Sequence, residues 1–191
     1  IDTLNIDIKK LKTAISKETK AIFAVNLLGN PNDFNELKTI CKNNEILLIE
    51  DNCESMGAKF NNKFTGTFGL MGSFSSFFSH HISTMEGGCV ITDDQELYEI
   101  MLCLRAHGWT RNLDTDNILT PLGKDPFEES FKFILPGYNL RPLEMSGAIG
   151  TKQLKKLPKF IDYRKQNAMF FLDKFKNFSN VKVQKEIGES S

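Results

Sequence analysis

The chain has 191 residues, of which 40% are hydrophobic, and this is enough apolar material for one substantial core. The 24 basic residues balance the 24 acidic residues, so the zero net charge gives no indication of a nucleic-acid partner. Nowhere do about 18 apolar residues run together, and no basic segment followed by an apolar core opens the sequence, so it predicts neither a membrane span nor a signal peptide. We therefore expect a cytoplasmic protein without a membrane partner.

The first half of the chain alternates helical and strand patterns. Residues 4–20 carry apolar side chains at helical spacing, and residues 32–44 form a second helical segment. Two short apolar runs, at 21–29 and 45–52, end in turn or acidic residues and are typical of buried strands. This order favours an α/β fold in which the two strands are parallel and joined by a right-handed crossover.

The second half of the chain contains a pair of strands and then mostly helices. Residues 73–78 and 87–94 are predicted to be neighbouring strands joined by a turn, and residues 95–108 are predicted to be a helix. The polar residues 109–130 predict an irregular loop, after which we expect one or two helices interrupted at Pro158. The predicted architecture is a mostly parallel sheet flanked by helices.

The four cysteines are widely spaced and form no C-x-x-C pair. Such spacing does not support a tetrahedral metal site, and a chain of this length without a signal peptide does not suggest disulfides. We expect no metal, and we interpret the cysteines as reduced and mostly buried in the core: Cys41, Cys53, Cys89 and Cys103.

Asp51 is the first candidate for chemistry because it stands just after the apolar run "ILLI", separated from it only by Glu50. Ligands bind at the carboxyl ends of strands in open parallel sheets, and an aspartate there can hold the proton of a cationic ring nitrogen. The alternative is that Asp51 only caps the short turn that follows it. Position alone does not separate these two interpretations.

His80 and His81 stand side by side in a chain that has only three histidines. Neighbours on an extended segment point to opposite faces, which disfavours joint binding of one metal ion. A nucleophile pair of Cys53 with His80 has no supporting local signature, and an ordinary surface or packed histidine pair is the alternative. A neutral imidazole is nevertheless well suited to moving protons. Ser75, on the preceding predicted strand, could bond a phosphate or simply satisfy nearby backbone.

Four blocks of the sequence together resemble the signatures of one family. They read, in chain order, "IEDNCESMGA", "TGTFGLMGSFSSFFSHHISTMEGGCVIT", "LRAHGWTR" and "PGYNLRPLEMSGAIGTKQLKKL". The chain resembles the DegT/DnrJ/EryC1/StrS sugar aminotransferases, which use pyridoxal phosphate (PLP) on the aspartate aminotransferase fold. The resemblance implies PLP fold type I, and it covers nearly the whole chain.

The resemblance also implies roles for individual residues toward the cofactor. Asp51 would face the pyridine nitrogen of PLP, and Glu54, three residues later, would reach the ring face or its hydroxyl. Ser75 would bind the cofactor phosphate. Asn139, in "PGYNLR", would cross the interface of a homodimer to the partner's cofactor phosphate. Arg141, from the same loop, and His81 are the residues that we expect to contact the substrate.

The sequence departs from the usual pattern of the family at the catalytic lysine. That lysine lies six residues before the glutamate of the "EGG" turn, and the count from Glu86 leads to His80. An imidazole cannot bond covalently to PLP as an amine does, but it can still accept and donate a proton. This pattern resembles the deoxysugar 3-dehydratases of the family, which remove a hydroxyl instead of delivering an amine.

The resemblance implies a reaction in two parts. L-glutamate would convert PLP to pyridoxamine phosphate (PMP), which would then act on a nucleotide-linked 4-keto-6-deoxy sugar, with GDP as the expected nucleotide. His80 would carry the proton, the C3 hydroxyl would leave, and the nitrogen would be released as ammonia. One histidine-bearing relative in the family uses an iron–sulphur cluster and has a C-x-C pair downstream of the histidine. In the present chain, the stretch after His107 has no cysteine.

The resemblance further implies that the chain is a fragment of about half of a typical member. We expect 1–157 to belong to the PLP-binding large domain, and 158–191 to be the linking helix and the start of a small C-terminal domain. Two alternatives stay open: an aminotransferase that has changed at the lysine, and an inactive fragment that serves as a binding or dimerisation module.

Overall fold

The computed structural model describes residues 2–187. Its contacts divide the chain into two compact units, of which the first joins Ile1–Ile91 to Glu144–Ser191 and the second is Thr92–Leu143. The proposed domain boundary at 157/158 stays a prediction.

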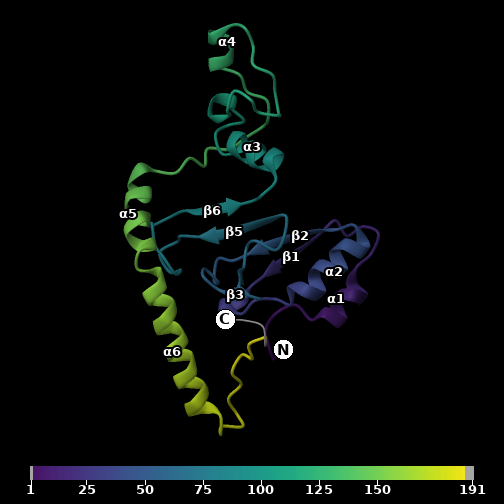
Figure 1. Ribbon diagram of the computed structural model, residues 1–191, viewed down its shortest axis with the longest axis vertical. Helices are drawn as coiled ribbons and strands as arrows, with labels where there is room; N and C mark the ends of the chain where they lie inside the picture. The colour runs from purple at the N-terminus through teal and green to yellow at the C-terminus, as the bar shows by residue number, and fades with distance from the viewer. Residues whose placement is uncertain (1, 188–191) are drawn as a thin grey trace. The chain divides into compact units, whose positions relative to one another are not determined.

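A four-stranded sheet forms the centre of the first unit (Figure 1). Its strands lie in the order β1-β2-β5-β6; β1 pairs with β2, and β2 with β5, in parallel, while β5 and β6 are antiparallel. These pairings confirm the predicted parallel pairing of the two apolar strands and the predicted returning strand. The bounds are Ala21–Val25 for β1, Leu47–Asp51 for β2, Met71–Ser75 for β5 and Gly88–Ile91 for β6, with a separate hairpin of β3 (Lys59–Phe60) and β4 (Lys63–Phe64).

The prediction of a strand over 73–78 was wrong at its C-terminal end. Strand β5 ends at Ser75; the chain turns two residues later, where the amide of His80 bonds the carbonyl of Phe77 at 3.0 Å. Phe77 and Phe78 are aromatic residues of the kind that favours strands, which explains the prediction. Backbone hydrogen bonds within the turn override that local preference.

Helices of the first unit come from two regions of the sequence. Helices α1 (Ile8–Ala14) and α2 (Phe34–Asn44) lie side by side near β1, whereas α5 (Glu144–Leu154) and α6 (Leu157–Phe175) lie where β5 points (Figure 1). Pro158 lies in the first turn of α6, so it begins a helix and does not interrupt one. A proline has no amide hydrogen to donate, and the first turn of a helix does not need that donor.

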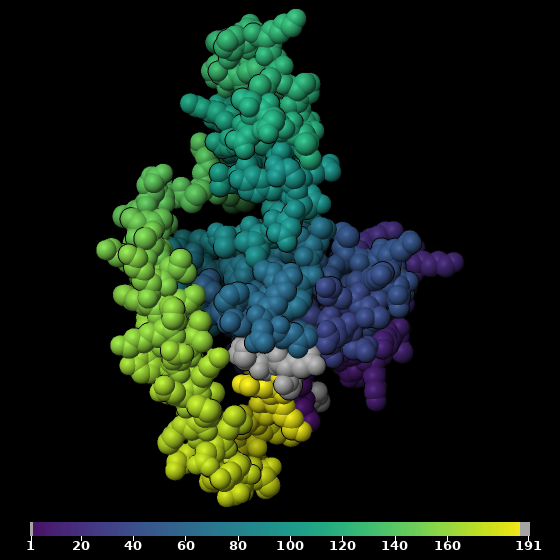
Figure 2. All heavy atoms as spheres, in the orientation of Figure 1, coloured from purple at the N-terminus to yellow at the C-terminus, as the bar shows by residue number. Residues whose placement is uncertain are grey.

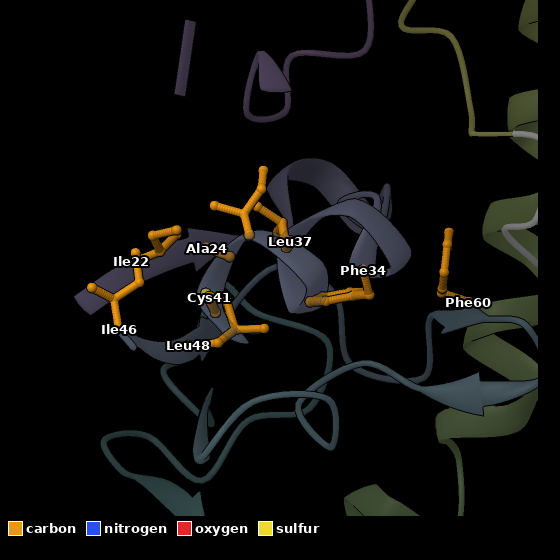
Figure 3. Packing of buried hydrophobic residues seen from close by; sticks show 9 residues of the cluster. Ile22, Ala24, Phe34, Leu37, Cys41, Ile46, Leu48 and Phe60 are labelled. Atoms are coloured by element: carbon orange, nitrogen blue, oxygen red, sulfur yellow. The ribbon is translucent and has the colours of Figure 1, made fainter. Parts of the chain in front are cut away.

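The hydrophobic core of this unit lies between α2 and the β1–β2 pair (Figure 3). Phe34 is fully buried, and its ring stacks on that of Phe68 with centroids 4.3 Å apart, while Phe60 meets Phe34 edge-on at 5.8 Å. This packing holds β1 and β2 in place, and Asn26 and Asp51 at their carboxyl ends lie outside the cluster. The buried cluster consists of Ile22, Ala24, Phe34, Leu37, Ile40, Cys41, Ile46, Leu48 and Phe60.

The second unit contains helix α3 (Gln95–Leu104), the 3-10 turn Thr110–Asn112 and the short helix α4 (Pro126–Ser130). The prediction of a helix to residue 108 was too long, because the backbone of His107 has a left-handed φ of 65° and cannot continue the helix. The predicted loop 109–130 contains α4, whose start is stabilised by the side chain of Asp125 and by a proline at its first turn.

Candidate functional site

Asp51 ends strand β2, where it pairs with Val25 on one side and with Ser73 on the other. Its carboxylate is half-buried, and Oδ1 accepts the amide hydrogen of Cys53 at 2.9 Å. Asp51 therefore does cap the turn that follows it, with one oxygen. A carboxylate can accept several hydrogen bonds, so this cap does not prevent Asp51 from also binding a ligand at the carboxyl end of the sheet, and the two interpretations are compatible.

The turn after Asp51 also fixes Glu54 and Cys53. Glu54 Oε2 accepts the amide hydrogen of Leu28 at 3.1 Å, which holds this carboxylate beside the loop after β1. Burial raises the pKa of the Cys53 thiol to about 11, and a hydrogen bond to Asp51 adds to the effect. Because a protonated thiol is a poor nucleophile, the structure disfavours the Cys53–His80 nucleophile pair.

Ser75 and His80 lie at the end of β5 and in the turn that follows it. Ser75 Oγ accepts the amide hydrogen of Phe77 at 3.2 Å, which leaves its own hydroxyl hydrogen to donate. The His80 amide donates to the Phe77 carbonyl at 3.0 Å, so the two histidines lie in a turn and not on an extended strand. The His80 ring meets Phe77 edge-on at 5.9 Å, and its Nδ1 is buried without a hydrogen-bond partner.

Both histidines line a pocket of about 380 Å³, and the opposite wall comes from α5 and α6. Figure 2 shows the side chains of α6, in yellow-green, standing at the surface of the first unit. His81 and Arg164 also line a second pocket of about 170 Å³, so these two side chains lie between the pockets. The first pocket is lined by Phe78, His80, His81, Ser83, Gln153, Phe160, Tyr163 and Arg164.

The environment of His81 favours its neutral form. Burial lowers the pKa of His81 to about 4, and the positive charge of Arg164 and the neighbouring His80 contribute in the same direction, while Glu54 opposes them. The sequence does not predict that Arg164, Gln153 and Tyr163 belong to this pocket, because no local motif links a helix near residue 160 to a turn near residue 80.

Glu50 is a further residue whose role the sequence did not reveal. It is fully buried, and its carboxylate accepts the amide hydrogens of Gly66 at 2.6 Å, Phe68 at 2.6 Å and Gly69 at 2.8 Å. A buried carboxylate without such donors would be costly. Its charge at the end of the apolar run "LLI" was the available signal. Glu50 holds the loop that leads into β5 and thereby places Ser75.

Asn139 and Arg141 lie at the surface of the second unit. The backbone of Asn139 forms a bridge with Ala106, and its Oδ1 accepts a hydrogen from Arg141 Nε at 3.4 Å. Both side chains are exposed. The predicted roles of these two residues toward a cofactor and a substrate stay predictions.

Comparison with known proteins decides the family. The profile of the DegT/DnrJ/EryC1/StrS aminotransferase family matches residues 1–191. The chain belongs to this family. It is 66% identical over 192 residues to the GDP-4-keto-6-deoxy-D-mannose 3-dehydratase of Escherichia coli O55:H7 (strain CB9615 / EPEC), a match that covers 100% of this chain and 50% of that protein. The chain thus spans about half the length of the curated relatives it matches.

Solved structures in this family share the fold of the chain. A mutant GDP-4-keto-6-deoxymannose-3-dehydratase with bound GDP-perosamine superposes with a TM-score of 0.93 at 65% identity, covering 99% of this chain and 49% of that one. The same dehydratase with a trapped PLP-glutamate geminal diamine superposes with a TM-score of 0.94, at the same identity and coverage. The predicted family and the predicted PLP fold type I are confirmed. Among the described residues, no helix has the length and apolar character to cross a membrane.

The residues at the carboxyl end of the sheet fit the PLP of this family. The Asp51 carboxylate can accept the hydrogen of a protonated ring nitrogen, and the Ser75 hydroxyl can donate to a phosphate. The buried and unpartnered Nδ1 of His80 is a group that a bound molecule could satisfy.

Proposed function

We propose that the protein containing this chain is a PLP/PMP-dependent dehydratase that removes the C3 hydroxyl of a GDP-linked 4-keto-6-deoxyhexose. The observation that carries the proposal is His80, which has an unpaired ring nitrogen and lines a pocket after β5, at the position that we assign to the catalytic lysine of this family. The 66% identity to a dehydratase of that substrate supports it.

The chain's own residues would hold the cofactor at the end of the sheet. Asp51 would pair with the ring nitrogen, Glu54 would lie at the ring, and Ser75 would bind the phosphate, with Asn139 contributed from the partner of a homodimer. When bound, PLP supplies an electron sink and, as PMP, carries the amino group taken from L-glutamate. The carboxylate of Asp51 would keep the ring protonated, as this role requires.

His80 would move the proton during loss of the sugar's C3 hydroxyl. An imidazole can take a proton and return it at neutral pH, and it cannot bond covalently to the cofactor as a lysine does. The amino group would therefore be released as ammonia. We assign the neutral His81 and Arg141 to contacts with the substrate.

The product would be a 4-keto-3,6-dideoxy sugar. Such a sugar suits the colitose branch of O-antigen and lipopolysaccharide biosynthesis, and we place the enzyme in the cytoplasm, where GDP-sugars are available to soluble enzymes. The expected assembly is a homodimer that shares its two active sites.

The experiment that tests this function measures ammonia and product mass together. Full-length protein is incubated with PLP, L-glutamate and GDP-4-keto-6-deoxymannose. Ammonia with a deoxygenated ketosugar supports the dehydratase. An amino sugar without ammonia would instead identify an aminotransferase. Absence of any spectral change with PLP would leave the binding or dimerisation module as the better interpretation.

A further inference from the structure

Three buried asparagines join the ends of β1 and β2 in one hydrogen-bond network. Asn26 Nδ2 donates to Asn52 Oδ1 at 2.8 Å. Asn26 Oδ1 accepts the amide hydrogen of Asn32 at 2.9 Å and a side-chain hydrogen of the same residue at 3.0 Å. Asn26 and Asn52 are 0% exposed and Asn32 is 1% exposed. Three amides are therefore buried at the very end of the sheet that carries the candidate site.

Asn52 stands between the two carboxylates that we assign to the cofactor. Its neighbour Asp51 bonds the amide of Cys53, and Glu54 follows two residues later. The backbone amide of Asn52 donates to the Ser73 carbonyl at 2.9 Å, which ties this segment to β5. The backbone amide of Asn26 also donates to the Asp51 carbonyl at 3.0 Å, so the side chain of Asn52 is a second point at which the end of β1 is tied to the segment from Asp51 to Glu54.

The loop after β1 contacts the same segment a second time. Leu28 lies in a left-handed conformation with a φ of 55°, and in this conformation its amide donates to Glu54 Oε2 at 3.1 Å. A positive φ at a leucine is energetically unfavourable and persists only where surrounding contacts impose it. The loop therefore holds both ends of the segment, Asn52 through Asn26 and Glu54 through Leu28.

We propose that Asn26 is a positioning residue that fixes Asp51 and Glu54 relative to each other for cofactor binding. The role in cofactor binding rests on the proposed function. The positioning of the two carboxylates rests only on the hydrogen bonds described above. The side chain at position 26 must donate a hydrogen bond to Asn52 and accept hydrogen bonds from Asn32. An amide on a short side chain, as in asparagine, provides both. A buried polar partner left unpaired by substitution would move to find another contact.

Two variants of the full-length protein test the proposal. Asn26→Asp keeps the acceptor for Asn32 and removes the donor for Asn52, while Asn26→Leu removes both. Ile22→Val is the matched control, since Ile22 lies on β1, the strand that Asn26 directly follows, and its buried side chain makes no hydrogen bond. Hydrogen exchange of the Leu28 and Cys53 amides is measured without cofactor, and PLP affinity is measured by titration.

We expect the Asn26 variants to exchange the Leu28 and Cys53 amides roughly 10-fold faster, because each amide bonds one of the two carboxylates. The Kd for PLP should rise by a similar factor, and amides of α2 should be unaffected. In Ile22→Val any change should instead spread over the whole sheet. Unchanged exchange at both amides, or a pattern like that of the control, would overturn the proposal. If the wild type fails to bind PLP, the proposed function falls while the exchange data still decide the role of Asn26.

Discussion

A hydrogen bond joins Asp51 to Cys53 at the end of β2: Oδ1 of the Asp51 carboxylate accepts the backbone amide hydrogen of Cys53 at 2.9 Å. The contact places the Cys53 thiol next to the carboxylate, and the thiol is also half-buried. The same short turn thus positions the proposed partner of the cofactor ring and suppresses a nearby nucleophile.

The reactivity of Cys53 reports on the carboxylate of Asp51. Burial, together with the hydrogen bond and the negative charge of Asp51, raises the pKa of the thiol to about 11, so Asp51→Asn should lower the pKa by a part of the shift. Alkylation of Cys53 at about pH 9 should then be several-fold faster, because the thiolate fraction is larger. Peptide mass spectrometry would resolve Cys53 from Cys41, whose contacts do not change. An equal rate in both proteins would show that the carboxylate does not act on the thiol.

His80→Ala should abolish dehydration while PLP remains bound. Loss of a proton-transfer group costs about 100- to 10,000-fold in rate, whereas Asp51 and Ser75 still hold the cofactor. Ammonia release measures the first effect and cofactor absorbance after gel filtration measures the second. Thr39→Ala on α2 serves as the control with normal turnover. Turnover close to wild type in His80→Ala would contradict the proton role.

His80→Lys should restore the covalent bond between protein and PLP. A lysine amine at this position can condense with the aldehyde, which an imidazole cannot do. Borohydride reduction followed by peptide mass spectrometry should locate the adduct at position 80. The wild type, treated in the same way, should give none. An adduct only on other lysines would mean that the lysine position of the family has been assigned wrongly.

Stability should depend on pH through His81. Its pKa is about 4 in the folded chain against 6.5 ordinarily, so between these pH values the unfolded state binds more protons. The free energy of unfolding should therefore rise with pH across this window. For a half-buried group, screened by solvent, the gain is on the order of 1 kcal/mol.

The charge of Arg164 should account for part of this shift. Arg164→Ala is expected to raise the pKa of His81 partway toward 6.5, since burial, the larger cause, persists. Lys165→Ala, on the same helix, is the matched control. NMR titration of the imidazole resonances measures the pKa of His81 in both variants. A titration of His81 identical in the Arg164 variant and in the wild type would rule out the contact.

Glu50→Gln should destabilise the protein far more than a similar change at the surface. A glutamine keeps one acceptor but turns a donor toward the amide of Gly66, so a hydrogen bond is lost in a buried place. We expect a loss of about 2–3 kcal/mol in urea denaturation. Glu36→Gln breaks only the exposed ion pair with Lys12 and should cost less than about 1 kcal/mol. Equal losses in the two variants would contradict the role assigned to Glu50.

Local patterns in the amino-acid sequence were sufficient for much of the fold. Apolar periodicity predicted α2, β1 and β2, and the order of these elements predicted their parallel pairing, since each depends on neighbours within a few residues. The family motifs were equally local, and they singled out Asp51 and His80. Boundaries were less well predicted, because the ends of β5 and α3 depend on backbone bonds made across the turns that follow.

The surroundings of those residues came from the tertiary structure. Arg164 reaches His81 from a helix more than 80 residues later, and Asn26 bonds Asn52 across two strands. The sequence spacing of the two residues predicts neither interaction, because asparagine is common at turns and arginine is common on helix surfaces. Burial changes their hydrogen-bond partners. An amide that would bond water at the surface must bond another protein group when water is excluded. Sequence motifs therefore identify which residues can do chemistry, and packing determines which others hold them in place.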